Sequence, residues 1–339
     1  MAASTNDHLT ITDEFAAKIK AENTKARITR IAPMLVLLAL VLFFSALRTS
    51  VFLSVGNLSA ILNQLAIPLM IAMGLTFVIM LGCIDLSIDG SVGMAGSLMS
   101  LLVMNTKNGN NLGMMGIVLA ILASVVIGAI IGLIYVKLKI PSFMVSFSFM
   151  YICMGIAMLS YGGIPATITD SFLIEVPKIA YFGIPVITWV AVIMFLIAYF
   201  IQEYTAFGRY IYAVGTDENI PRMAGVNVNR VKILVFAFAG LCFGIAGVLG
   251  GIRLGQGQMQ IGIGTMFPSQ AAVVVGGTAL SGGKGGMMNT LIGVLIITVL
   301  DNGLLLMSVN PYIKTGIQGL IILVAVALTV TRSNKIITK

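Results

Sequence analysis

The chain has 339 residues, a formal net charge of +8, 58 % hydrophobic residues and only 9 % charged residues, and its mean hydropathy is +1.05. This composition excludes a soluble globular protein and is typical of an integral membrane protein. Long stretches such as residues 31–47 are apolar on every side instead of alternating with polar residues. We therefore predict an all-α, polytopic transmembrane bundle and not a β-barrel.

The apolar stretches predict ten membrane-spanning helices. The eighth and the tenth are short or weakly bounded, so nine or eleven crossings stay open and some segments can be re-entrant. The predicted division is an N-terminal segment 1–30, a transmembrane domain 31–331 and a tail 332–339. In chain order, the predicted spans are 31–47, 58–82, 88–105, 112–135, 142–160, 184–201, 231–252, 266–280, 287–308 and 314–331.

The distribution of basic residues indicates the orientation of the chain. With the N-terminus inside, fifteen of the 20 Lys and Arg residues fall in inner segments and five in outer ones, which is the bias of cytoplasmic loops. We therefore expect both termini to be cytoplasmic. The net charge then reflects topology, and no nucleic-acid partner is expected. The five outer residues are Arg48, Lys107, Lys178, Arg253 and Lys314.

Residues suited to catalysis or metal binding are scarce. His8 is the only histidine, and the three cysteines lie in apolar segments, where a small buried hydrophobic role is expected. The pair Gly283-Lys284 does not complete a phosphate-binding loop, because Thr278 and Gly285 occupy positions that need glycine and Ser or Thr. We expect neither enzymatic activity nor a cofactor or metal.

Two glycine-rich turns interrupt the apolar pattern. Asp85, Ser87 and Asp89 open like a calcium loop, but Gly96 stands where the bidentate Glu belongs. A conformational break between helices is the better interpretation. The second turn holds Gly282 and Gly283, and both turns contain Leu-Ser between apolar runs. An internal repeat would produce this pattern, although glycine-rich composition alone can mimic it.

Polar side chains inside predicted spans are candidates for a substrate pathway, because such groups are costly in lipid and face a cavity or another helix. Interhelical hydrogen bonding that only holds the bundle together is the alternative for each of them. The candidates are Asn63, Gln64, Gln270, Asp301 and Asn302.

Three motifs in order carry a resemblance that spans residues 31–331: IDLS, GRYIYAVGTDENIPRMAGVNVNRVK and VVVGGTALSGGKGG. Together they closely resemble the permeases of ribose-type bacterial ABC importers for simple sugars. The resemblance implies a multi-pass protein of the bacterial cytoplasmic (inner) membrane that forms a homodimeric pore. It also implies a cytosolic ATPase, as separate subunits or in tandem, and a periplasmic or lipid-anchored sugar-binding protein.

The substrate is less well defined by this resemblance. Sugar permeases often have Glu-Leu-Asp where this chain has Met266-Phe267-Pro268. A permease for nucleosides or another small polar solute therefore stays open. An ion-coupled secondary transporter is less favoured, because Asp301 is a solitary acid in the spans.

The loop 202–232 resembles the segment through which such permeases contact the ATPase. Asn219 or Glu218 can cap a short helix, roughly Ile220 to Ala224, whose first turn accommodates Pro221. We expect this helix to dock into the ATPase. The expected coupling residues are Arg209, Asn219, Ile220, Arg222, Met223 and Gly225.

Overall fold

The structure is a computed structural model that describes residues 31–310, 312–317, 319–320 and 323. The predicted segments 1–30 and 332–339 and most of the predicted span 314–331 lie outside the described residues. After a first helix, Ile31–Leu47, the helices are α2 (Thr49–Phe52), α3 (Val55–Met80), α4 (Ile88–Leu102), α5 (Met114–Leu138), α6 (Ser142–Tyr161), α7 (Ser171–Glu175), α8 (Val186–Tyr204), α9 (Ala206–Thr216), α10 (Asn219–Met223), α11 (Val228–Leu254), α12 (Met266–Val275) and α13 (Met287–Leu306).

The all-α prediction is confirmed. Six of the described helices, α3, α5, α6, α8, α11 and α13, are long and apolar enough to cross a membrane. The first nine predicted spans coincide with helices whose ends differ from the prediction by at most three residues, except at the end of the eighth. Short antiparallel strand pairs join the connecting loops: β1 (Ala166–Thr167) with β4 (Gln256–Gly257), and β2 (Ala180–Tyr181) with β3 (Ile184–Pro185).

Helices α3 and α11 form the centre of the molecule. Their most apolar stretches are 72 % and 67 % buried, against 28 % for α5. The main hydrophobic core is built on α3 and α11 and on the helices around them, and Phe77, Phe236 and Phe243 are its largest buried side chains. The outer faces of α5, α6 and α8 are apolar and exposed, as expected for surfaces that meet lipid or another membrane chain.

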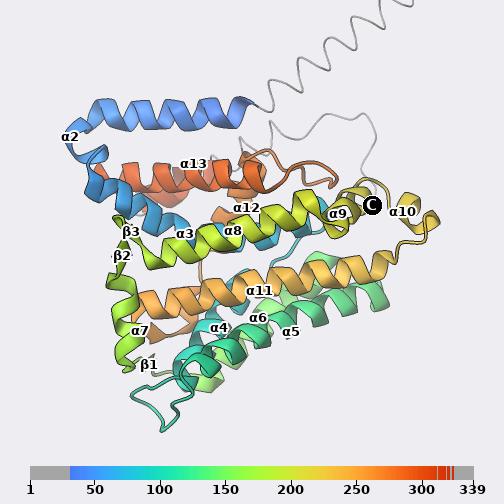
Figure 1. The fold of residues 1–339 in the computed structure, drawn as a ribbon, viewed down its shortest axis with the longest axis horizontal. Helices are drawn as coiled ribbons and strands as arrows, with labels where there is room; N and C mark the ends of the chain where they lie inside the picture. The colour runs from blue at the N-terminus through green and yellow to red at the C-terminus, as the bar shows by residue number, and fades with distance from the viewer. Residues whose placement is uncertain (1–30, 311, 318, 321–322, 324–339) are drawn as a thin grey trace, which may run out of the picture.

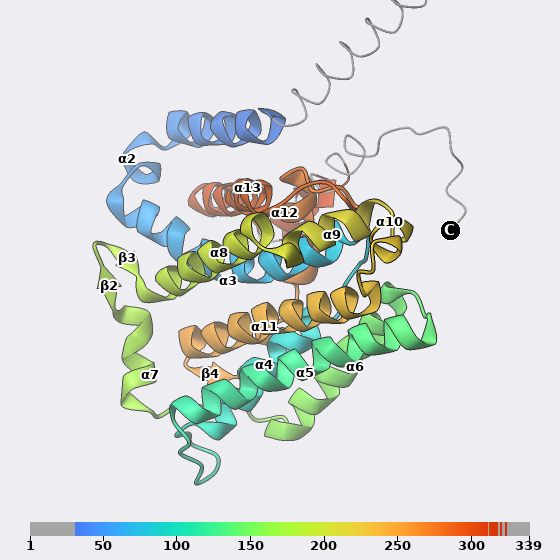
Figure 2. The same cartoon turned by 45° about the vertical axis from the view of Figure 1, so that its right-hand side comes forward.

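Glycines bring α5 and α11 into backbone contact. A side chain at Gly128 would clash with the carbonyl of Phe236, and one at Gly240 would clash with the carbonyl of Ser124. Such small residues let transmembrane helices approach closely enough for dispersion forces to hold them. The two helices therefore form a tightly packed pair, seen side by side in Figure 1 and Figure 2.

The first helix packs against α13 along one side of the bundle (Figure 2). Phe44 is 3 % exposed and lies over Gly303, where any side chain would clash with its ring. Phe52 packs beside Phe44, with ring centroids 5.8 Å apart and the rings tilted by 31°. The absence of a side chain at Gly303 thus lets the first helix cross α13 closely.

The eighth predicted span is shorter than predicted. The predicted helix 266–280 ends at Val275 in the structure, because the chain turns at Gly276 and Gly277, and Gly277 has a φ of +108°. Before α12, strand β4 and the 3-10 helix η2 (Met259–Ile261) pack along α4. A side chain at Gly262 would clash with the carbonyl of Asp89. A short helix preceded by irregular backbone therefore replaces one continuous span, an arrangement that membrane proteins tolerate where the backbone is covered by protein.

Candidate functional site

The predicted docking helix is present as α10, at one end of the bundle (Figure 1). It runs from Asn219 to Met223, one residue earlier than predicted, and Pro221 is its third residue. Proline is tolerated there because the first N–H groups of a helix have no partner within it. Gly225 follows with a φ of +80° and ends the turn, as predicted.

Glu218, one of the two predicted caps, occupies the N-cap position of this helix, but its side chain makes no capping hydrogen bond. Instead, Asp217 Oδ1 accepts a hydrogen bond of 2.9 Å from the backbone N–H of Asn219. Glu218 points to two cations, pairing with Lys232 and lying 3.8 Å from the guanidinium of Arg222. The pair with Arg222 has the local i,i+4 spacing, whereas Lys232 is a tertiary partner that local spacing does not reveal.

The exposed surface of α10 is apolar at its centre and basic around it. Ile220 is 59 % exposed and Met223 is 81 % exposed. Arg222 and Arg209 are also exposed, whereas Val226 is half-buried. The helix therefore presents two apolar side chains flanked by arginines.

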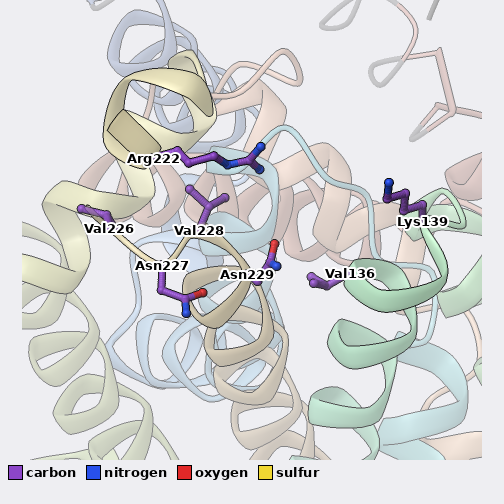
Figure 3. A pocket seen from close by; sticks show the side chains of 7 residues that line it. All are labelled: Val136, Lys139, Arg222, Val226, Asn227, Val228 and Asn229. Carbon is purple, nitrogen blue, oxygen red and sulfur yellow. The ribbon is translucent and has the colours of Figure 1, made fainter. Parts of the chain in front are cut away.

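A hollow of about 400 Å³ lies beside α10 (Figure 3). It opens between the end of α5 and the start of α11, and Arg222 and Lys139 approach it from different elements. Two cations at one opening favour acidic groups of a partner. The lining residues are Val136, Lys139, Arg222, Val226, Asn227, Val228 and Asn229.

The turn between α3 and α4 is held in place by its neighbours. Asp85 and Ser87 are each 1 % exposed, and Asp85 Oδ1 accepts a 2.8 Å hydrogen bond from the backbone N–H of Ser87. The two backbone N–H groups on either side of Asp85 donate to the hydroxyls of Ser142 and Ser146 on α6, at 3.1 and 2.9 Å. Gln270 on α12 donates to the carbonyl of Asp85 at 3.0 Å. The irregular backbone of this turn is therefore satisfied by side chains from two other helices.

Asp89 connects α4 to the start of α12. Its carboxylate accepts hydrogen bonds from the backbone N–H of Gly264 at 3.0 Å, the hydroxyl of Thr265 at 3.2 Å and the backbone N–H of Met266 at 2.9 Å. The N-terminus of a helix carries unpaired N–H groups and a partial positive charge, which a carboxylate satisfies. Asp89 thus caps a helix from a distant part of the chain.

The two predicted turns contact each other. The backbone N–H of Gly283 donates to the carbonyl of Met80, at the end of α3, over 2.9 Å. Gly282 and Gly283 have φ values of +82° and +69°, and side chains there would clash with the last residues of α9. Gly215 of α9 packs against both turns. The helix that leads into α10 is therefore in backbone contact with both turns.

Gln202 on α8 and Tyr212 on α9 hydrogen-bond to the start of α13 and to the turn before it, and neither residue was predicted from the sequence. Gln202 is 3 % exposed, and its Oε1 accepts from the backbone N–H of Met287 at 2.6 Å, so it caps α13. Its Nε2 donates to the hydroxyl of Tyr212 at 2.8 Å, and that hydroxyl donates to the carbonyl of Gly285 at 2.9 Å. The only sequence feature that could have indicated this role is a glutamine directly after the apolar run 184–201.

The predicted pathway residues fall into separate contacts. Asn302 is 2 % exposed and exchanges two hydrogen bonds, of 3.0 and 3.1 Å, with the side chain of Asn57 on α3. Asp301 forms a 3.3 Å ion pair with Lys314. Gln270 contacts Asp85, as described above. These three residues therefore hold elements together.

Asn63 and Gln64 lie in the N-terminal half of α3. Asn63 Oδ1 is buried and has no hydrogen-bond partner among the described residues, and Arg253 on α11 donates to the backbone carbonyl of Asn63 at 3.3 Å. Pro68 has no N–H to offer the carbonyl of Gln64. The Asn63 side-chain oxygen is thus an acceptor that the described chain does not use.

Comparison with known proteins gives consistent results. The family described as "Branched-chain amino acid transport system / permease component" matches residues 57–326. Ribose import permease protein RbsC of Escherichia coli (strain K12) is 34 % identical over 309 residues, 89 % of this chain and 94 % of that protein. RbsC of Haemophilus influenzae is 37 % identical over 281 residues, covering 81 % and 85 %.

A third relative acts on a different sugar. Galactose/methyl galactoside import permease protein MglC of Escherichia coli (strain K12) is 34 % identical over 310 residues, 87 % of this chain and 91 % of that protein. No solved structure matches this chain. The family matches most of the chain, including the loop 202–232 and both glycine-rich turns. The chain therefore belongs to the family of branched-chain amino acid transport system / permease components.

Proposed function

We propose that this chain is the membrane-spanning permease subunit of an ATP-binding-cassette importer for a monosaccharide, ribose or a related sugar. The observation that carries the proposal is its similarity to ribose and galactose import permeases over nearly the whole length of each protein. The protein is a multi-pass component of the bacterial inner membrane, as its long apolar helices require. The sugar is delivered from outside by a binding protein.

A cytosolic ATPase drives the cycle by contacting α10. The exposed apolar side chains of Ile220 and Met223 supply an anchor that a cleft on the ATPase can bury, and Arg209 and Arg222 add charge at its rim. Acidic groups of the ATPase complement the hollow beside α10. The permease works as a pair of identical chains, with the sugar passing between them.

The helices are oriented with α10 and both chain termini in the cytoplasm. Seven described basic residues lie in α9, α10, the turn before α13, and the ends of α5 and α11 that meet them, against five at the opposite ends of the helices. This asymmetry supports the orientation. The seven are Lys137, Lys139, Arg209, Arg222, Arg230, Lys232 and Lys284.

The sugar pathway runs along the outer half of α3. Asn63 and Gln64 are its main polar contacts, because the Asn63 side chain and the Gln64 carbonyl offer acceptors to sugar hydroxyls. Gln270 and Asp301 border the pathway, and Asn302 fixes its outer rim through Asn57.

Reconstitution tests this function. The chain is placed in lipid vesicles with the ATPase and binding protein encoded near it, and uptake of labelled ribose, galactose and a nucleoside is measured with and without ATP. We expect ATP-dependent uptake of a monosaccharide only when all three proteins are present. Uptake of the nucleoside alone would replace the sugar with that substrate class, and uptake driven by a proton gradient without partners would make the chain a secondary transporter.

The docking role of α10 is tested separately. Met223→Asp and Arg222→Glu alter exposed side chains of α10, so the fold should survive while sugar uptake and co-purification of the ATPase fall about tenfold or more. Lys178→Glu, an exposed charge change on η1 (Val176–Lys178) at the other end of the molecule, is the matched control. If both α10 variants keep normal uptake and ATPase binding, α10 is not the docking helix.

A further inference from the structure

Lys232 is a buried lysine in the second turn of α11, only 8 % exposed. A buried ammonium group needs partners, because an unpaired charge away from water is very costly. Its Nζ forms an ion pair with Glu218, the residue directly before α10. The same Nζ donates to the hydroxyl of Tyr135 on α5 at 3.2 Å and lies 4.9 Å from the centre of that ring.

The contact continues to the turn between α3 and α4. The thiol of Cys83, a buried residue in that turn, donates to the Tyr135 hydroxyl at 3.4 Å. A phenol oxygen can accept two hydrogen bonds, so Lys232 and Cys83 can share it. Glu218, Lys232, Tyr135 and Cys83 therefore form a line of side chains from α10 to this turn, which we name the Glu218–Cys83 chain.

The middle of the Glu218–Cys83 chain is held by tightly packed helices, whereas Glu218 at its other end lies at the surface. Lys232 and Tyr135 sit on α11 and α5, which glycines lock together through direct backbone contact at Gly132 and Ile233. Glu218, in contrast, lies in the exposed loop that ends α9, with its side chain 41 % exposed. Its other cation, Arg222, is 3.8 Å away and mostly in solvent, where an ion pair contributes little to stability. The ion pair with Lys232 is thus the contact that connects the start of α10 to the packed helices α5 and α11.

We propose that Glu218, Lys232 and Tyr135 are positioning residues that hold α10 in register with α5 and α11 and pass its displacement by the ATPase to the turn between α3 and α4. This inference rests on the proposed function. That turn is bonded to α12 through Gln270 and lies against the glycine turn before α13. A movement of α10 that reaches Cys83 therefore reaches the helices on both sides of the pathway.

The test uses the complete importer in lipid vesicles and measures two quantities, ATP hydrolysed per sugar transported and the amount of ATPase that co-purifies. Glu218→Gln and Tyr135→Phe remove one charge and one hydroxyl and keep side-chain shape. We expect ATP consumed per sugar to rise about fivefold or more, since coupling between sites is typically worth that factor. ATPase binding should stay at the wild-type level, because neither side chain is on the exposed face of α10.

Two further variants separate coupling from folding. Lys232→Arg keeps the charge, so its ratio of ATP hydrolysed to sugar transported should stay near that of the wild type. Lys232→Met should raise this ratio as Glu218→Gln does. The double variant Glu218→Gln/Lys232→Met should raise it no further than either single change. Lys137→Met removes an exposed lysine from the last turn of α5 and is the matched control.

Two results would overturn the inference. One is a wild-type ratio of ATP to sugar in both Glu218→Gln and Tyr135→Phe. The other is a loss of uptake that follows the loss of assembled protein in every variant, which would mark the Glu218–Cys83 chain as purely structural. Failure of the wild-type complex to take up sugar would instead refute the proposed function, so the two failures are distinguishable.

Discussion

Asp89 shows how one side chain can join distant parts of the bundle. Three donors from residues 264–266 converge on its carboxylate, which is 9 % exposed. Removing it in Asp89→Ala leaves buried donors unpaired, which should lower the free energy of unfolding by about 2–3 kcal/mol. Asp217→Ala, which removes an exposed helix cap, should cost at most about 1 kcal/mol. Thermal unfolding in detergent compares the two, and equal losses would contradict the capping role of Asp89.

The Asn57–Asn302 pair separates a structural from a transport role. Asn57→Leu leaves the buried amide of Asn302 unpaired, at a cost of about 1–3 kcal/mol. The double variant Asn57→Leu/Asn302→Leu removes both partners, so it should be less destabilised than the two single changes predict together. From the single variant Asn57→Leu to the double variant, the melting temperature and the sugar uptake should rise together. A stable double variant that no longer transports would place Asn302 in contact with the sugar.

At the scale of elements, apolar runs predict most helices, but tertiary contacts decide where several of them end. The helix at residues 31–47 and α6 were predicted almost to the residue, because lipid requires continuous backbone hydrogen bonding. The early end of α12 depends on Gly276 packing against α13. The pairing of Glu218 with Lys232 crosses 14 residues of chain, so no helical periodicity encodes it. Likewise, neither the capping of α13 by Gln202 nor the capping of α12 by Asp89 can be read from local sequence.

The contact between α5 and α11 depends on single glycines. Gly128→Ala would push a methyl group into the carbonyl of Phe236, with no flexible neighbour to give way, so we expect a loss of folded protein and a melting temperature several degrees lower. Gly155→Ala on α6 is the matched control. Its new methyl group meets nothing within 4 Å, and alanine favours helix by about 0.5–1 kcal/mol. A Gly128→Ala variant as stable as Gly155→Ala would show that the helices do not pack this closely.

At the scale of the whole molecule, the proposed coupling and transport regions lie towards opposite ends of the same helices. Helix α10 is at one end and the α2 and β2–β3 region is at the other (Figure 1). Asn63 lies in the half of α3 nearer the α2 end, and Cys83 lies just beyond the C-terminus of α3, at the α10 end. In the proposed mechanism, tilting of α3 and α12 carries a movement at α10 to the far half of the pathway and changes the packing of α3 against α11 in the main core.

The orientation of the whole molecule can be tested with reporter fusions. Fusions after Gly109 or Lys178 join the reporter to loops at the α2 end of the bundle, and fusions after Lys139 or Val226 join it to the α10 end. Because basic residues concentrate at the α10 end, that end should stay in the cytoplasm. Alkaline phosphatase, active only outside, should be active after Gly109 and Lys178, and a fluorescent protein that folds only inside should be bright after Lys139 and Val226. The reverse pattern would invert the molecule and place α10 out of reach of any cytosolic ATPase.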